Sequence, residues 1–123
     1  MDLIAIRARY LRDALPIRLG GIAANLARIT SFSRHVANRE TVEHIIKESK
    51  LFIEWTAPET DVDAAAVLVE LQLQLAQWQH CLAGIWEDTE KRQAMIEQSR
   101  DWSKRVLDMS GLLREDPSYC RGR

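Results

Sequence analysis

The sequence predicts an all-α protein: an antiparallel four-helix bundle with an additional short N-terminal helix, or with a first helix kinked at a proline. The 123 residues include five glycines and three prolines, and long stretches contain neither, which favours a few long helices over many short strands. Apolar residues recur at steps of three and four in five segments, the period of an amphipathic helix. The four longer segments would each be roughly 27 to 39 Å long, similar enough to lie side by side.

Pro16 separates the first two segments. The first, about residues 2 to 15, places one apolar face along Leu3, Ile6, Tyr10 and Ala14. The second, about residues 17 to 37, has an apolar face of Leu19, Ile22, Leu26, Ile29, Ser33 and Val36. Its other side, expected to contact water, carries Arg18, Asn25, Arg28 and His35. Pro16 suits either the first turn of the second helix or a kink between the two, because proline has no N–H to donate.

The third segment, about residues 39 to 56, follows the plausible N-cap Asn38 and ends at Ala57-Pro58. Its apolar stripe consists of Val42, Ile45, Ser49, Phe52 and Thr56, flanked by Ile46, Ile53 and Trp55. Thr60, with Asp63 three residues on, resembles a capping box that starts the fourth segment. From there to about Trp86 a heptad pattern predicts a seam against a partner helix, formed by Leu68, Leu71, Leu75, Trp78, Leu82 and Ile85.

The fourth segment also alternates apolar and polar residues from Val67 to Leu75, which is the period of a strand. Its alanines, leucines and glutamines favour a helix, and about 24 positions without a turn residue exceed the usual length of a strand. We therefore expect a helix.

The fifth segment, about residues 89 to 113, has a helical stripe of Met95, Ser99, Trp102, Val106, Met109 and Leu113. Gly111 should weaken its last turn. Residues 1–116 are expected to form a single helical bundle domain, and residues 117–123 a flexible C-terminal tail.

A second apolar band follows the fourth segment, about 100 to 180 degrees around the helix from the heptad seam. Its residues, the candidate interface, are Ala66, Val69, Leu73, Ala76, His80 and Ala83. A helix in a monomeric bundle normally exposes a wide polar strip, so something is expected to cover this band. Two coverings are open: the N-terminal helix, or a second subunit or other protein partner.

Charges are unevenly distributed along the chain. Residues 1–39 contain seven arginines and two acids, whereas residues 40–99 contain four bases and twelve acids. Contact with nucleic acid phosphates is one reading of the arginines, and its candidate residues are Arg7, Arg9, Arg12, Arg18 and Arg28. They are spread around two helices with no recognised DNA-reading arrangement, so we prefer a solvated face that complements an acidic neighbour.

Metal or ligand binding is a weaker alternative. Glu40, His44 and Glu48 form a ladder at four-residue steps that could supply a mixed metal site, but a solvated, charged helix face is the simpler reading. Four tryptophans could line an aromatic pocket, although their core-like spacing favours packing anchors. No metal or other cofactor is therefore expected.

The sequence offers no catalytic constellation. Cys81 and Cys120 form no CxxC pair, and Cys81 has no nearby histidine expected to point toward it as a catalytic partner. The N-terminus is not arranged as a signal peptide, and residues 62–86 hold too many polar groups for a membrane span. We therefore expect a cytoplasmic, non-enzymatic protein that acts through protein–protein interaction, most simply as a homodimer, with no membrane contact. The alternatives are a regulator that contacts nucleic acid and a small-ligand or metal-binding bundle.

Overall fold

The structure is a computed structural model that describes residues 2–112. These residues form five α-helices: α1 (Leu3–Leu11), α2 (Leu15–Phe32), α3 (Arg39–Thr56), α4 (Val62–Glu87) and α5 (Thr89–Ser110). Two short 3₁₀ turns, η1 (Val36–Asn38) and η2 (Ala57–Glu59), connect α2 to α3 and α3 to α4. No strand occurs within residues 2–112. The all-α prediction is confirmed, and the fourth segment is a helix.

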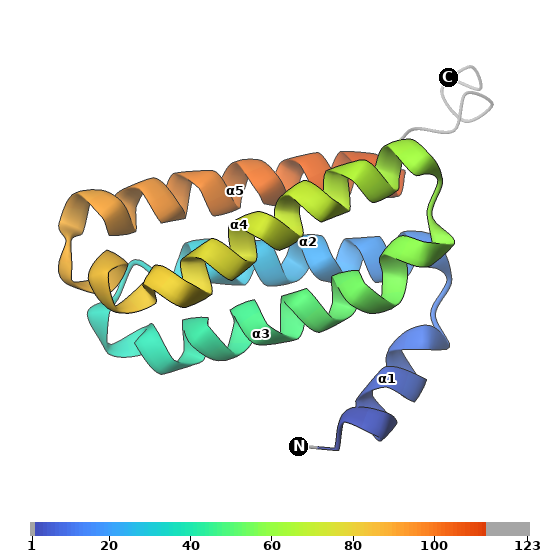
Figure 1. Ribbon diagram of the computed structural model, residues 1–123, viewed down its shortest axis with the longest axis horizontal. Helices are drawn as coiled ribbons and strands as arrows, with labels where there is room; N and C mark the ends of the chain where they lie inside the picture. The colour runs from blue at the N-terminus through green and yellow to red at the C-terminus, as the bar shows by residue number, and fades with distance from the viewer. Residues whose placement is uncertain (1, 113–123) are drawn as a thin grey trace, which may run out of the picture.

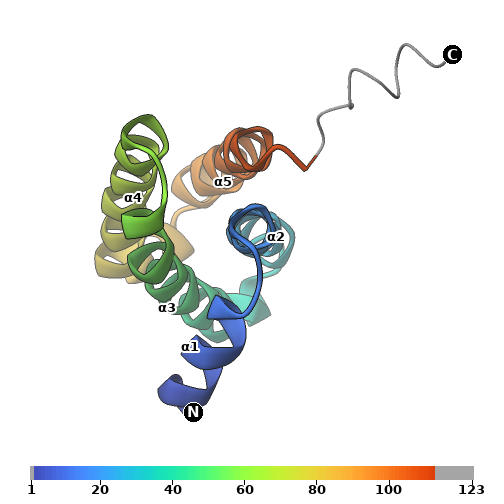
Figure 2. The ribbon, with the colours of Figure 1, turned by 90° about the vertical axis from the view of Figure 1, so that its right-hand side faces the viewer.

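The four long helices, α2 to α5, lie alongside one another, and successive helices run in opposite directions (Figure 1). Viewed from the end, they surround a common interior, and α1 lies outside it beside α3 (Figure 2). One cluster of buried apolar side chains fills that interior, with contributions from all four long helices. Because α1 stays outside, the core is closed by α2 to α5 alone.

Pro16 occupies the first turn of α2, and α1 is a separate helix that ends before it. The first-turn alternative is therefore the one observed. At its other end α2 stops at Phe32, earlier than predicted, and Val36 is 63% exposed instead of continuing the apolar face. The Val36 carbonyl accepts a hydrogen bond from the Trp86 indole at 2.8 Å, which ties this connection to the end of α4.

Helix α4 begins one residue later than predicted, at Val62. Asp61, not Thr60, is the N-cap: its carboxylate accepts a hydrogen bond from the Ala64 backbone N–H at 2.8 Å. The Thr60 hydroxyl instead donates to the Ala57 carbonyl at 2.8 Å and closes the η2 turn. A carboxylate also suits the positive end of a helix.

Two polar residues predicted to face water are buried on α2. Arg18 is 5% exposed, and Asn25 is also buried. The reason is the position of α2, which packs closely on both α3 and α5 while the α1–α2 connection folds against its first turn. A helix with so many neighbours has little free circumference, so its polar side chains must find partners inside the protein.

Helix α5 ends at a glycine with a left-handed backbone. Gly111 has a φ of 79° and caps the helix after Ser110, a conformation that glycine adopts without steric cost. Residues 113–123 lie outside the described part of the chain, and with them Leu113, Cys120, the end of the predicted domain and the predicted tail. No helix in residues 2–112 combines the length and apolar character of a membrane span.

Candidate interaction surface

The heptad seam of α4 faces the interior, as predicted. Its members Leu68, Leu71, Leu75, Trp78 and Leu82 are buried, and Ile85 is partly buried against the same core. With this side fixed inward, the geometry of a helix places the second apolar band on the outside.

The second band is exposed along most of its length. Val69 is 55% exposed and Leu73 is 68% exposed. Ala66, His80 and Ala83 are exposed, and Ala76 is half-buried. Val62, one heptad before Val69, extends the band to the start of the helix and is 84% exposed. We call the residues Val62, Ala66, Val69, Leu73, Ala76, His80 and Ala83 the outer seam of α4.

Helix α1 does not cover the outer seam. Figure 2 shows α1 on the far side of α3 from α4, and Tyr10 anchors it there by stacking on Phe52 with ring centroids 4.1 Å apart. Of the two coverings left open by the sequence, the N-terminal helix is therefore excluded within the chain.

Polar contacts hold both flanks of α4 to its neighbours. On the α5 side, Glu70 pairs with Arg105 at 3.4 Å. On the α3 side, the Gln72 amide donates to the Lys50 carbonyl at 3.0 Å, and the Lys50 ammonium donates to Gln79 at 2.7 Å. These contacts lie on either side of the outer seam, and the solvent-facing surface of α4 consists of this seam and of a polar strip that includes Glu70, Gln77 and Cys81.

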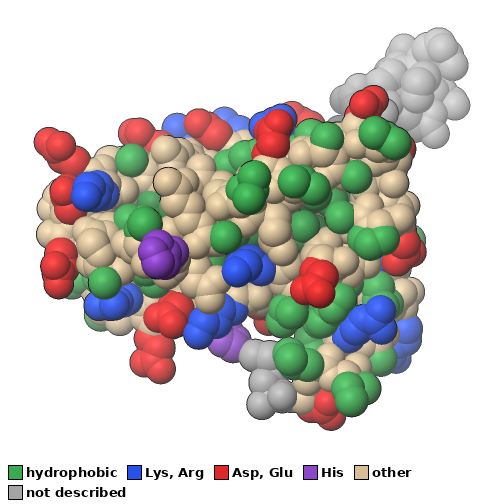
Figure 3. Space-filling view, in the orientation of Figure 1, with side chains coloured by type: hydrophobic (Ala, Val, Ile, Leu, Met, Phe, Trp, Pro, Cys, Tyr) green, Lys and Arg blue, Asp and Glu red, His purple; other side chains and the backbone are tan. Residues whose placement is uncertain are grey.

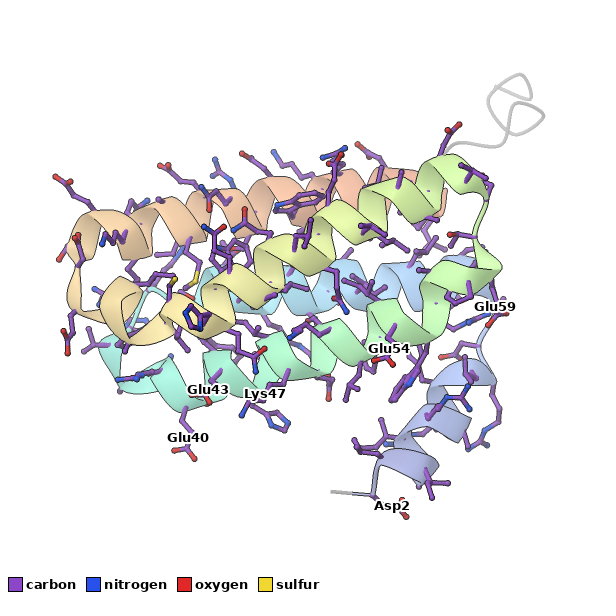
Figure 4. The ribbon with its side chains drawn as sticks, in the orientation of Figure 1. Asp2, Glu40, Glu43, Lys47, Glu54 and Glu59 are labelled. Atoms are coloured by element: carbon purple, nitrogen blue, oxygen red, sulfur yellow. The ribbon has the colours of Figure 1, made fainter. Side chains whose placement is uncertain are left out.

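A shallow hollow lies beside the outer seam, between α4 and the end of α3. Its volume is ≈ 270 Å³, and it is lined by Ile53, Glu54, Ala57, Val69, Gln72 and Leu73. Figure 3 shows apolar side chains gathered over this half of the face, with charged groups more frequent toward the other end. Glu54 is the charged group of this lining and projects from α3 (Figure 4).

Comparison of the chain with protein families, with curated proteins and with solved structures found no match.

The arginines proposed for nucleic acid contact do not form one surface. Arg7, Arg9 and Arg12 are exposed on α1. Arg18 is buried, and its guanidinium binds both carboxylate oxygens of Glu59 at 2.9 Å. Arg28 is exposed on α2 and donates to the Asn25 amide oxygen at 3.2 Å. The structure thus leaves Arg18 unavailable to an outside phosphate, and it places Arg28 on a different helix from Arg7, Arg9 and Arg12.

The Glu40, His44, Glu48 ladder does not converge on a metal position. Glu40 and His44 are exposed on α3, and Glu40 points away from the bundle (Figure 4). Glu48 instead accepts a hydrogen bond from the Asn25 amide at 3.1 Å. Among the described residues, no three His, Cys, Asp or Glu side chains come together as metal ligands would. Cys81 is exposed and free on α4.

Sequence reasoning missed the contact that joins α1 to the bundle. The Tyr10 hydroxyl donates to the Arg18 carbonyl at 2.9 Å and lies 3.0 Å from the Thr56 hydroxyl. Burial raises the pKa of the Tyr10 phenol to about 12, and the hydrogen bond from Arg18 lowers the pKa of Glu59. The sequence carried one usable signal, the tyrosine on the apolar face of α1, but nothing that named its partners.

Proposed function

We propose that this protein is a non-enzymatic helical protein that acts by associating with protein, first with a second copy of itself, through the outer seam of α4. The scaffold of this proposal is an antiparallel four-helix bundle of α2 to α5. One observation carries it: Val69 and Leu73 stay exposed although α3 and α5 hold both flanks of the same helix.

Burial of these side chains supplies the driving force. Fully burying a valine or leucine side chain stabilises by roughly 1.5 to 3 kcal/mol, and Val69 and Leu73 are still 55% and 68% exposed. A contiguous apolar patch on a soluble protein commonly marks an interaction site. The hollow beside Val69 and Leu73 adds a concave edge in which a partner side chain can be seated.

The groups with shifted pKa values support a structural role elsewhere in the molecule. The Tyr10 hydroxyl on α1 donates to the backbone carbonyl of Arg18 on α2, and the Arg18 guanidinium donates to Glu59 on η2. These hydrogen bonds join α1, α2 and η2. These hydrogen bonds and the burial of Tyr10 account for the shifted pKa values. The exposed apolar side chains of the outer seam of α4, in contrast, have no such role in holding the fold together.

Light scattering during size-exclusion chromatography tests the proposal. We expect the apparent mass to rise from 14.1 kDa toward twice that value as the protein concentration rises through the micromolar range. Leu73→Glu places a charge in the seam and should keep the protein at the monomer mass, with an unchanged helical circular dichroism spectrum.

Val36→Glu is the matched control. Val36 is 63% exposed, nearly as much as Leu73, but lies at the α2–α3 connection and not on α4. This variant should associate like the wild type. A wild-type mass of 14.1 kDa at every concentration up to the high micromolar range would contradict the proposal, as would equal loss of association in both variants.

A further inference from the structure

The outer seam of α4 repeats with heptad spacing. Successive members are separated by four and three residues in strict alternation, from Val62 through Ala66, Val69, Leu73, Ala76 and His80 to Ala83. This is the spacing of a coiled-coil seam, and α4 therefore has two such seams, one buried in the bundle and one facing solvent. The second seam needs a helix of matching period as its partner.

Six of the seven residues of the seam form pairs that are equidistant from position 71. Val69 and Leu73 are equidistant from that position, and so are Ala66 and Ala76, and Val62 and His80. In an antiparallel coiled coil related by a twofold axis, equidistant residues of the two helices face each other. A second copy of α4 therefore offers a matching residue at every one of these positions.

We propose that two copies of this chain dock through the outer seams of α4 in an antiparallel, twofold-symmetric arrangement centred at Leu71. This inference rests on the proposed function and names its geometry. Val69 of each copy packs on Leu73 of the other, Ala66 packs on Ala76, and Val62 packs beside His80. The alanine layers, with their small side chains, let the two backbones approach closely on either side of the central Val–Leu layers.

Shifting the register by one heptad weakens the match. If the axis moves toward the C-terminus of α4, Val62 faces Glu87, an acidic residue in the same heptad position. If it moves the other way, Ala76 faces Glu59, which belongs to η2 and already binds Arg18. The register centred at Leu71 also places Glu59 opposite Ala83, at the end of the seam. Among the three registers it alone packs Val69 on Leu73 at the centre of the contact, and this pairing favours it.

Charge also permits self-association. The chain has a formal net charge of −1, so two copies repel each other only weakly. In the proposed register His80, which is polar, lies near the polar side chains of Asp61 and Asp63 of the second copy. The two Glu70 side chains approach on one side of the axis, and each is already paired with Arg105 of its own copy.

The contact is small enough to predict a weak dimer. From Val62 to Ala83 the seam is about 33 Å long, and a strip about 10 Å wide gives a footprint of about 330 Å² per copy, against about 800 Å² in stable complexes. We therefore expect association in the micromolar range, with the Ile53 and Ala57 hollow contributing at its edge.

Disulfide trapping tests the register. Ala66→Cys and Ala76→Cys are made separately in a chain carrying Cys81→Ser and Cys120→Ser, and each is oxidised alone and as an equal mixture at high micromolar concentration. A disulfide requires Cα atoms roughly 4.4 to 6.8 Å apart. In the proposed dimer, residues 66 of the two copies are about 15 Å apart along the axis, so neither variant alone should form a covalent dimer and the mixture should.

Each outcome separates the register from the association itself. Covalent dimer in the mixture alone, together with the dimer mass in light scattering, supports both. If the protein has the dimer mass and each single variant forms a covalent dimer, the two helices are parallel. If it has the dimer mass but no variant or mixture forms a disulfide, the chains associate through another surface or in another register. Either result overturns this inference and leaves self-association standing, whereas a monomer at every concentration overturns both. Circular dichroism of each variant verifies that it is folded.

Discussion

Tyr10 is the residue that decides where α1 lies. Its ring stacks on Phe52 and tilts against Trp55, with centroids 4.1 and 6.0 Å away. Its hydroxyl reaches the Arg18 carbonyl and the Thr56 hydroxyl. A helix of nine residues is too short to be stable in isolation, so α1 depends on this side chain to remain docked.

Raising the pH should undock or unfold this region between about pH 10 and 12. The Tyr10 pKa is about 12 in the folded protein and 10.0 in the unfolded chain. The raised pKa means that its contribution to stability is complete below pH 10 and is lost as the pH rises through about 12. The free energy of unfolding should fall by at most about 1.4 kcal/mol for each pH unit in this range. Melting temperatures from pH 8 to 12 measure it.

Tyr10→Phe is the control for that titration. It keeps the ring and removes the hydroxyl, so we expect a loss of about 1 kcal/mol at neutral pH from the hydrogen bonds and a shallower decline of stability above pH 10. If the variant and the wild type lose stability with the same slope between pH 10 and 12, the ionisation of Tyr10 is not the cause.

At the scale of the elements, short turns determine how the helices pair. Asp88 ends α4 and caps α5, because its carboxylate accepts from the Glu90 and Lys91 backbone N–H groups at 3.0 and 3.2 Å. Asp61 does the same for the start of α4. Asp61 therefore marks the start of α4 and Asp88 marks its end, so both ends of the helix that carries the outer seam are defined by a capping residue.

Asp61→Ala should destabilise the protein by about 1 kcal/mol, because it removes the acceptor for an otherwise unpaired N–H group in the first turn of α4. Urea unfolding followed by circular dichroism measures the change. Asp63→Ala is the matched control: its carboxylate lies in the same first turn, but Asp61 supplies the capping bond. A loss at Asp63 equal to or greater than that at Asp61 would contradict this assignment of the cap.

At the scale of the whole molecule, α4 differs from the other long helices because one of its sides is buried and the opposite side exposes apolar residues. The buried faces of α2, α3 and α5 pack into one core with the heptad seam of α4. The outer seam of α4 faces solvent on one side of the molecule (Figure 3). On the other long helices, the large apolar side chains that are exposed are Ile17 and Phe32, both on α2, and both are less exposed than Leu73.

Dimer formation should make thermal stability depend on protein concentration, because a partner that binds only the folded chain stabilises it by mass action. We expect the melting temperature of the wild type to rise by a few degrees for each tenfold increase in concentration within the micromolar range. Leu73→Glu should melt at one temperature throughout. Scanning calorimetry at three concentrations measures this, and a concentration-independent wild type would speak against association of folded chains.

The sequence by itself determined the helical class, the approximate helix positions and both apolar seams of α4. These are local properties: a side chain's direction repeats every 3.6 residues along any helix, so its pattern is visible without the fold. The helix ends were less predictable, as Val36 and Thr60 show, because capping depends on which neighbouring group captures a backbone bond.

Only the tertiary structure decided that α1 docks on α3 and that Arg18 and Asn25 are buried. Each of these outcomes depends on a partner far away in the chain. Glu59 lies 41 residues from Arg18, and Thr56 lies 46 residues from Tyr10. A periodic pattern states which side of a helix is apolar, but whether a polar side chain can be buried depends on whether the fold brings a hydrogen-bonding partner to it.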